Sequence, residues 1–126
     1  MANTILPGYM APIGDKYWIH FDHTGPASYT QHVAAATPTG GDIINASDLG
    51  VGGFDNMDSM MDSTGRFYAI PLPIAGGSGN AVTQMMLVWY SAVTATVGGQ
   101  AQTAGSEVAA GTNLSSFALR IEAICI

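Results

Sequence analysis

Histidine and aspartate residues gather near position 20, and their types could hold a metal ion. His20, Asp22 and His23 fall within one short segment, and His32 follows a few residues later. A zinc or copper site needs three or four such ligands that converge on one point. No cysteine or glutamate lies near them in the sequence, so hydrogen bonding across a sheet or at a subunit interface is the favoured interpretation. We therefore predict no metal site and no cofactor.

A second group of candidate ligands, Asp55, Asp58 and Asp62, offers the oxygen atoms that calcium prefers. The run "DNMDSMMDSTG" nevertheless lacks the spacing of an EF-hand loop. Asp62 begins the tetrapeptide "DSTG", whose composition is typical of a tight turn. The favoured interpretation is that Asp62 caps this turn while the other two carboxylates face solvent.

Residue types that serve in nucleophilic catalysis are present, but no catalytic signature surrounds them. The serine of "GGSGN" lies between glycines without the strand–turn–helix setting of a nucleophile elbow. The segment "GVGG" is not a phosphate-binding loop, because no strand-to-helix unit is expected around it. We predict that the protein is not an enzyme.

The composition argues against two classes of partner. The chain has 126 residues, a charged fraction of 10% and a formal net charge of -6. Its strong bases are Lys16, Arg66 and Arg120, too few to neutralise a nucleic-acid backbone or to attach to an anionic membrane. No apolar run approaches the roughly 20 residues that cross a bilayer, and the N-terminal segment lacks the features of a secretory signal.

Short alternating segments separated by turn residues predict an all-β protein. "KYWIHFDH" (residues 16–23) alternates and is rich in aromatic and β-branched residues. Residues 81–97 are apolar on both faces, which is typical of a strand covered on both sides. Weaker strands are expected at residues 29–37 and on both sides of a turn at residues 62–65. The pattern predicts about seven or eight short strands and no convincing helix. It indicates an antiparallel β-sandwich or barrel with a jelly-roll-like arrangement.

The segment between these strands at residues 42–53 fits more than one structure. Asp42 could begin a strand, and Ser47 could cap a single helical turn. The glycines at positions 50, 52 and 53 exclude a long helix here.

The chain ends in an alternating apolar stretch, which predicts a terminal strand with one buried face. One side of the two-residue period carries five side chains: Phe117, Leu119, Ile121, Ala123 and Cys125. The opposite side carries Arg120 and Glu122. We expect the first set to face the core, which makes the single cysteine a small buried hydrophobe.

The first fourteen residues show no period and contain two prolines and two glycines. They predict an extended N-terminal arm at residues 1–14, followed by a single β-sandwich domain at residues 15–126. The apolar side chains of such an arm still need cover, which a neighbouring subunit would supply. The residues expected to make subunit contacts are Leu6, Tyr9, Met10, Ile13 and Trp18.

Four segments together carry a family resemblance: "TGGDIINASDLGVGGF", "STGRFYAI", "LVWYSA" and "GSEVAAGTNLSSFALRIEAI". They resemble small structural proteins that tailed bacteriophages encode beside their major capsid protein. In that group a "GGD-hydrophobic-L" segment precedes several strands, an "E-V-x-A-G-T-(D/N)-L-S" turn and a closing strand. Residues 107–115 match the turn, and Arg120, Ala123 and Ile124 match the close. The similarity covers residues 29–126, and it departs at the end, where "CI" replaces a glycine-terminated tail.

The resemblance implies a capsid decoration (cement) protein, which binds the outer surface of a tailed-phage capsid and stabilises it. Its partners would be the major capsid protein and further copies of itself, with a trimer at threefold or quasi-threefold positions as the expected state. It would be found on the virion surface, after assembly in the host cytoplasm. The matched motifs are structural, and none of them contains a catalytic residue.

An alternative is a carbohydrate- or receptor-binding β module of a phage head fibre or tail. Trp18, Tyr68 and Trp89 would then form a platform on which a sugar ring stacks. A solvent-facing row of these side chains would favour this alternative. Bound metal would instead favour a small β-fold enzyme or metal protein that uses the histidines.

Overall fold

The computed structural model describes residues 2–76 and 82–126, and within them the protein is all-β. The side chains of residues 2, 5–11, 13, 75 and 76 lie outside this description. The strands are β1 (Ala2–Ile13), β2 (Lys16–Thr24), β3 (Asp42–Asn45), β4 (Phe54–Ser59), β5 (Phe67–Gly76), β6 (Val82–Ser91), β7 (Ala95–Val97), β8 (Gln100–Gln102) and β9 (Ala118–Cys125). The expectation of an all-β protein without a long helix is confirmed for the described residues.

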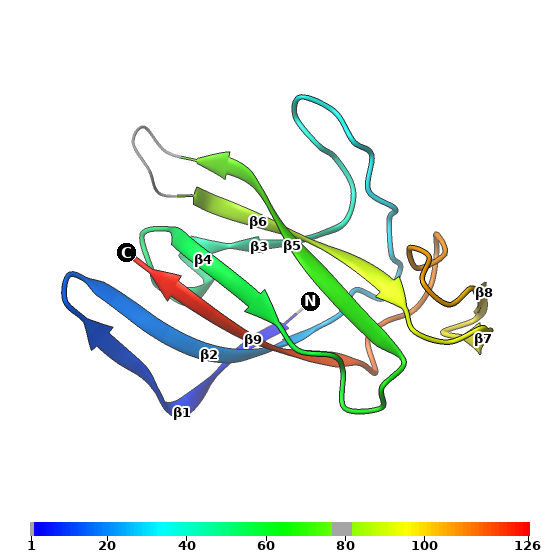
Figure 1. Ribbon diagram of the computed structural model, residues 1–126, viewed down its shortest axis with the longest axis horizontal. Coiled ribbons are helices and arrows are strands. Elements are labelled where there is room, and N and C mark those ends of the chain that lie inside the picture. Colours follow the sequence, from blue (N-terminus) through cyan, green and yellow to red (C-terminus); the bar gives the residue numbers. More distant parts are fainter. Residues whose placement is uncertain (1, 77–81) are drawn as a thin grey trace.

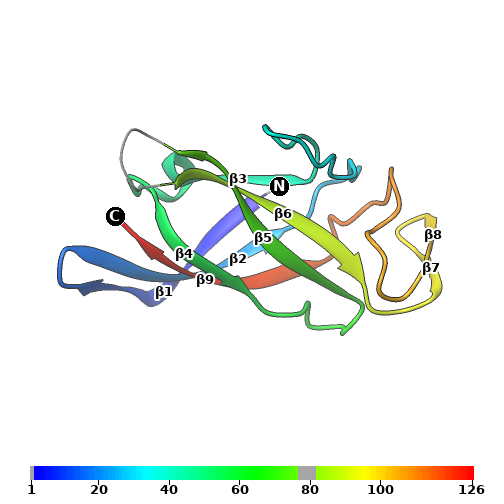
Figure 2. The same cartoon turned by 45° about the horizontal axis from the view of Figure 1, so that its top comes forward.

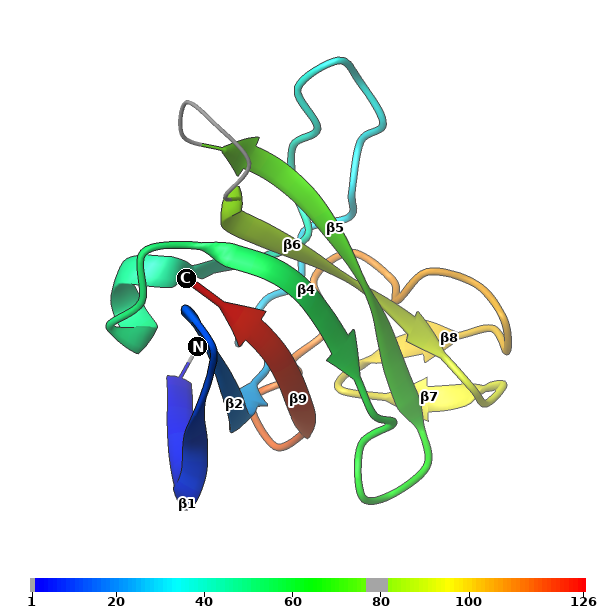
Figure 3. The same ribbon diagram turned by 60° about the vertical axis from the view of Figure 1, so that its left-hand side comes forward.

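Seven strands form one antiparallel sheet that curls into a half-barrel (Figure 1, Figure 2). Its order is β1-β2-β9-β4-β6-β3, with β5 also paired to β6, while β7 and β8 form a separate hairpin. β4 meets β6 through the residue pair Phe54 and Val82. The sheet bends at this junction, and Figure 3 shows β5 crossing in front of β6, with β4 and β9 running beside them. The two parts, β1-β2-β9-β4 and β5-β6-β3, therefore enclose the core between them.

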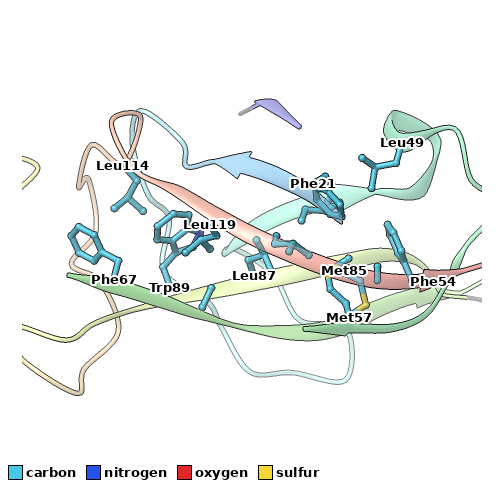
Figure 4. Close-up of a cluster of buried hydrophobic side chains, with 14 of the residues drawn as sticks. Phe21, Leu49, Phe54, Met57, Phe67, Met85, Leu87, Trp89, Leu114 and Leu119 are labelled. Atoms are coloured by element: carbon cyan, nitrogen blue, oxygen red, sulfur yellow. The ribbon is translucent and has the colours of Figure 1, made fainter. Parts of the chain in front are cut away.

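The core is built by the two-residue period of the strands that line the half-barrel. In β2, Ile19 and Phe21 are fully buried, and in β9 every second residue from Leu119 to Cys125 is buried. β6 adds Met85, Leu87 and Trp89, and Figure 4 shows these side chains between the two parts of the sheet. Phe117, just before β9, is partly buried. Its ring packs edge-on against that of Phe67, with 4.8 Å between the ring centroids. The predicted register of the C-terminal strand is confirmed.

The buried face of β9 makes a chemical prediction for the single cysteine. Cys125 is fully buried, and burial raises the pKa of its thiol to about 11. Because the thiolate is the reactive form, we expect the native protein to react with a thiol reagent at least about a hundredfold more slowly than the unfolded chain. Measuring the reaction with and without denaturant tests this. Rapid reaction of the native protein would place Cys125 on the outer side of β9.

Most of the N-terminal arm expected at residues 1–14, namely Ala2–Ile13, is a strand paired within its own chain. The backbone of β1 is extended, as predicted, but it forms an antiparallel hairpin with β2. The pairing is irregular between Ile5 and Met10, a stretch that contains Pro7. An edge strand needs backbone partners on one side only and tolerates proline there. A segment without an apolar period can therefore still join a sheet.

The strand expected at residues 29–37 is instead a loop. Its one bridge joins Val33 to Thr39, and Gly41 donates its backbone N–H to the Thr30 carbonyl, so the segment folds back on itself. Gly40 has a φ of 78, and a Cβ there would collide with the backbone of Gln31. The reversal of the chain therefore depends on glycine at position 40. A strand favoured by the residues before it cannot continue through this position.

The single strand expected at residues 81–97 is divided into β6 and β7. The Ser91 hydroxyl accepts the backbone N–H of Val93 at 3.2 Å and lies 2.7 Å from the Val93 carbonyl, to which it donates. This local turn ends β6, because a serine side chain competes with the sheet for backbone groups. The β7–β8 hairpin that follows was not predicted.

One turn of 3-10 helix, η1 (Ala46–Leu49), follows β3. Asn45 precedes it, in place of the predicted Ser47 cap, and it makes no side-chain capping bond. Gly50 ends the turn with a φ of 71°, a conformation that favours glycine.

In the part of the chain that the structure describes, no helix is long and apolar enough to cross a membrane.

Asp62 organises the turn between β4 and β5, as predicted. One carboxylate oxygen accepts the backbone N–H groups of Arg66 (2.9 Å) and Phe67 (2.7 Å), and the other accepts the N–H and hydroxyl of Thr64. Burial on its own raises the pKa of Asp62, but these hydrogen bonds outweigh burial and hold the pKa below its ordinary value. The ionised carboxylate therefore stabilises the fold.

We expect Asp62→Ala to lower the free energy of unfolding by about 1–3 kcal/mol, because it leaves backbone donors unpaired. The pH dependence has a defined sign. A depressed pKa contributes stability above the pKa of the unfolded state, and that contribution is lost as the pH falls through the lower, folded-state pKa. Urea unfolding of both proteins at neutral and strongly acidic pH measures this. The difference between them should shrink in acid, and a difference that stays constant contradicts the role of the charge.

Candidate functional site

The structure does not bring the predicted metal-binding candidates together. His20 and Asp22 lie on the outer face of β2, His23 enters the core, and His32 lies in the loop before β3. No group of three or more histidine, cysteine or acidic residues is close enough to hold a metal ion among the residues described. The imidazoles of His20 and His23 take part in side-chain hydrogen bonds, and that of His20 reaches Glu122 on the neighbouring strand.

The three aspartates considered as calcium ligands each have different surroundings. Asp55 forms an exposed ion pair with Lys16 at 2.5 Å. Asp62 is occupied by its turn, while Asp58 is exposed on β4 opposite Glu122 of β9. The three carboxylates therefore make separate contacts.

A buried polar cluster joins three strands that are distant in the sequence. His23 of β2 is 0% exposed and Asp42 of β3 is 1% exposed, and Nε2 of the histidine lies 2.6 Å from Oδ2 of the aspartate. Trp89 Nε1 donates to the same oxygen at 3.0 Å. On the other side of the ring, Nδ1 of His23 lies 2.5 Å from Oδ1 of Asn3 in β1. Buried polar side chains need hydrogen-bond partners of this kind to persist.

A second polar contact ties the loops at one end of the half-barrel. The hydroxyl of Tyr29 donates to Oε2 of Glu107 at 2.8 Å and accepts the backbone N–H of Trp89 at 3.1 Å. The same carboxylate oxygen accepts the backbone N–H of His32. Burial raises the pKa of Tyr29, and the neighbouring carboxylates of Glu107 and Asp42 raise it further. Tyr29 therefore remains a protonated donor and holds the 25–41 loop to the 103–117 loop.

The outer surface of β2 and β9 carries alternating charges, and we call it the charged outer face. His20 lies 3.2 Å from Glu122, and Arg120 donates to Asp22 at 2.7 Å. Met60 and Met61 are exposed beside these pairs. A shallow pocket of about 360 Å³ is lined by Asp22, Met60, Met61, Ser63, Ala118 and Arg120. The charged side chains on this face are therefore largely paired with one another.

The outer surface of β5 and β6 has a different character, and we call it the apolar outer face. It comprises the exposed Ile70 and the half-buried Tyr68, Leu72 and Tyr90, and their cross-strand neighbours Met86 and Val88 are buried. Ile70 is 54% exposed, and the rings of Tyr68 and Tyr90 stack at 5.5 Å. Exposed and half-buried apolar side chains gathered on one sheet face mark a place where another surface can bind.

The predicted contact residues fall into two groups. The side chains of Leu6, Tyr9, Met10 and Ile13 lie outside the described residues, so their contacts stay a prediction. Trp18 is half-buried on β2 with its ring edge-on to His20 at 4.4 Å.

The aromatic platform considered for sugar binding is not assembled. Trp89 is fully buried in the core, so it cannot stack on a ligand at the surface. Trp18 lies on β2 and Tyr68 on the apolar outer face of β5, which belong to the two opposite parts of the sheet.

Comparison of the chain with protein-family models, with curated proteins and with solved structures found no match.

The buried cluster of His23, Asp42 and Trp89 was not predicted from the sequence. These residues are separated by 19 and 47 positions, and no local motif connects them. A buried histidine on the apolar side of a strand period was the one available signal.

Proposed function

We propose that this protein is a structural component of a tailed-phage virion, which binds the outer surface of the capsid and stabilises it as a decoration protein. The observation that carries the proposal is the apolar outer face of β5 and β6. A chain with a charged fraction of 10% presents stacked tyrosines and an exposed Ile70 there. Such a face suits permanent contact with protein, because interface centres are depleted in charge and enriched in aromatic residues.

The partner we propose for this face is the major capsid protein, and the choice of partner rests on the sequence resemblance. The self-contacts of a homotrimer would use the N-terminal hairpin, and the proposed contact residues are Leu6, Tyr9, Met10 and Ile13 of β1 and Trp18 of β2. β1 is an end strand of the main sheet, and an end strand offers backbone groups for further pairing. The jelly-roll-like sandwich or closed barrel belongs to the same proposal, since neighbouring copies could complete the half-barrel.

A capsid-binding experiment tests the proposed function directly. The purified protein is mixed with empty capsids of the phage that encodes it, and the capsids are sedimented. We expect saturable binding, with a copy number comparable to that of capsid subunits or their threefold sites, and capsids that resist heating better when coated. The proposal would be overturned if the protein sedimented as a stable monomer and did not bind the capsids.

The apolar outer face has its own test. Ile70→Asp places a charge in the centre of the proposed contact, and we expect it to weaken capsid binding by at least about tenfold. The fold should tolerate this change, because Ile70 is more exposed than buried. Thr96→Asp adds the same charge at an exposed position on the β7–β8 hairpin and serves as the matched control. Equal binding by both variants would move the contact away from β5 and β6.

A further inference from the structure

The two ends of the main sheet are β1 and β3 in its strand order, and the buried polar cluster bridges them. Asn3 comes from β1, His23 from the neighbouring β2, and Asp42 from β3. The half-barrel therefore has a seam, and at this seam the imidazole ring of His23 lies between a side-chain amide and a carboxylate. Hydrogen bonds of the ring substitute for the backbone pairing that a closed barrel would have here.

The chemistry of the ring follows from its two partners. Nε2 faces the carboxylate oxygen of Asp42 at 2.6 Å, and Nδ1 faces the amide oxygen of Asn3 at 2.5 Å. Both partners are acceptors, and a neutral imidazole carries a hydrogen on one nitrogen only. The imidazolium form alone donates at both positions. Its charge would be costly in the core without a counter-ion, and the Asp42 carboxylate supplies one at contact distance.

We propose that His23 is a buried imidazolium that latches β1 across the seam, and that loss of its proton as the pH rises releases the N-terminal end of β1. The proton that leaves is the one on Nδ1. The hydrogen on Nε2 points at a carboxylate and is held more strongly than the hydrogen that points at a neutral amide. The link between β2 and β3 is then retained, while Asn3 loses its donor.

Among the side chains that the structure describes, few other groups around the ring could titrate in its place. β6 contributes Trp89, which donates a hydrogen bond to Asp42, and β9 contributes the apolar Leu119 opposite His23. β1 contributes the uncharged Asn3. Tyr29 lies within electrostatic reach of Asp42 and remains protonated beside Glu107. The pH response of the seam is therefore assigned to the His23–Asp42 pair.

The protonation state of His23 is measured by nitrogen-15 NMR of the imidazole ring in the full chain. We expect two protonated nitrogens at acidic and neutral pH, each with a slowly exchanging hydrogen. As the pH rises, Nδ1 should lose its hydrogen before Nε2. A ring that is neutral throughout, with the amide of Asn3 donating to a bare Nδ1, overturns the proposal.

Hydrogen exchange tests whether the proton controls β1. Protection factors of the backbone amides at residues 2–5 are compared with those of β9 between roughly pH 5 and pH 10, a range that spans histidine titration. We expect protection in β1 to fall at least about tenfold as His23 loses its proton, because a hydrogen bond from a charged donor disappears. Protection in β9 should stay constant. Unchanged protection in β1 contradicts the latch.

Two variants make the test specific without disturbing the buried ion pair. Asn3→Ala removes the acceptor and should hold β1 at its low, alkaline level of protection at every pH. Thr4→Ala changes the exposed neighbour and should keep the wild-type profile. A pH-dependent profile that survives in Asn3→Ala would show that β1 responds to another group.

Discussion

Replacing Asp42 with alanine is expected to lower the free energy of unfolding by about 3–5 kcal/mol, the usual effect of removing one partner from a buried ion pair such as the one proposed for His23 and Asp42. Asp42 is 1% exposed, and its carboxylate is the hydrogen-bond partner of both His23 and Trp89. Without it the imidazole and the indole N–H remain buried and unpaired. A domain of this size has a total stability of roughly 5–15 kcal/mol, so the loss is a large part of the whole.

The measurement is urea unfolding followed by tryptophan fluorescence, with Asp58→Ala as the control. Asp58 is an exposed aspartate that faces Glu122 in the strand register. Its removal should change the stability by less than about 0.5 kcal/mol, as surface substitutions usually do. Equal effects of the two changes would mean that Asp42 is not held in the core as a charged group.

Truncation of Leu119 to alanine is the second substitution with a large expected effect. The side chain is fully buried in β9 and lies between the two parts of the sheet (Figure 4). Removing it leaves a cavity in addition to the lost burial, which typically costs about 2–5 kcal/mol. We therefore expect a decrease in melting temperature of about 5–15 °C, measured by calorimetry or circular dichroism.

The adjacent position on the other face provides the control for β9. Glu122 is exposed and forms a surface contact with His20 at 3.2 Å. Exposed pairs of this kind contribute about 0–1 kcal/mol, so Glu122→Gln should barely change the melting temperature. If Leu119→Ala were neutral while Glu122→Gln destabilised the protein, the two faces of β9 would be exchanged.

Much of the local structure followed from short-range patterns. The alternation in β9 placed Leu119 on the buried side, and that in β2 placed Ile19 and Phe21 on one shared face, because a strand sends successive side chains to opposite faces whatever its partners are. The "DSTG" turn was predictable for a similar reason, since the Asp62 side chain binds backbone groups within five residues of itself.

Other segments escaped prediction because their structure depends on distant residues. β1 has no apolar period, yet the backbone of β2 gives it a partner. The 29–37 segment has moderate β-propensity, but the reversal at Gly40 and the tie from Tyr29 to Glu107 make it a loop. Propensity is a weak guide wherever a long-range contact competes with it.

The sequence by itself determined the β class, the alternation of β2, the buried face of β9, the Asp62 turn and the low charged fraction of the chain. Each of these depends on residue type and spacing over a few positions. Tertiary structure decided the pairing of β1, the curl of the sheet and the assembly of Asn3, His23 and Asp42 at its seam. The physical reason is that a two-residue period specifies which side of a strand is buried but not which strand lies beside it. The contacts of His23 therefore appear only when the ends of the curled sheet meet.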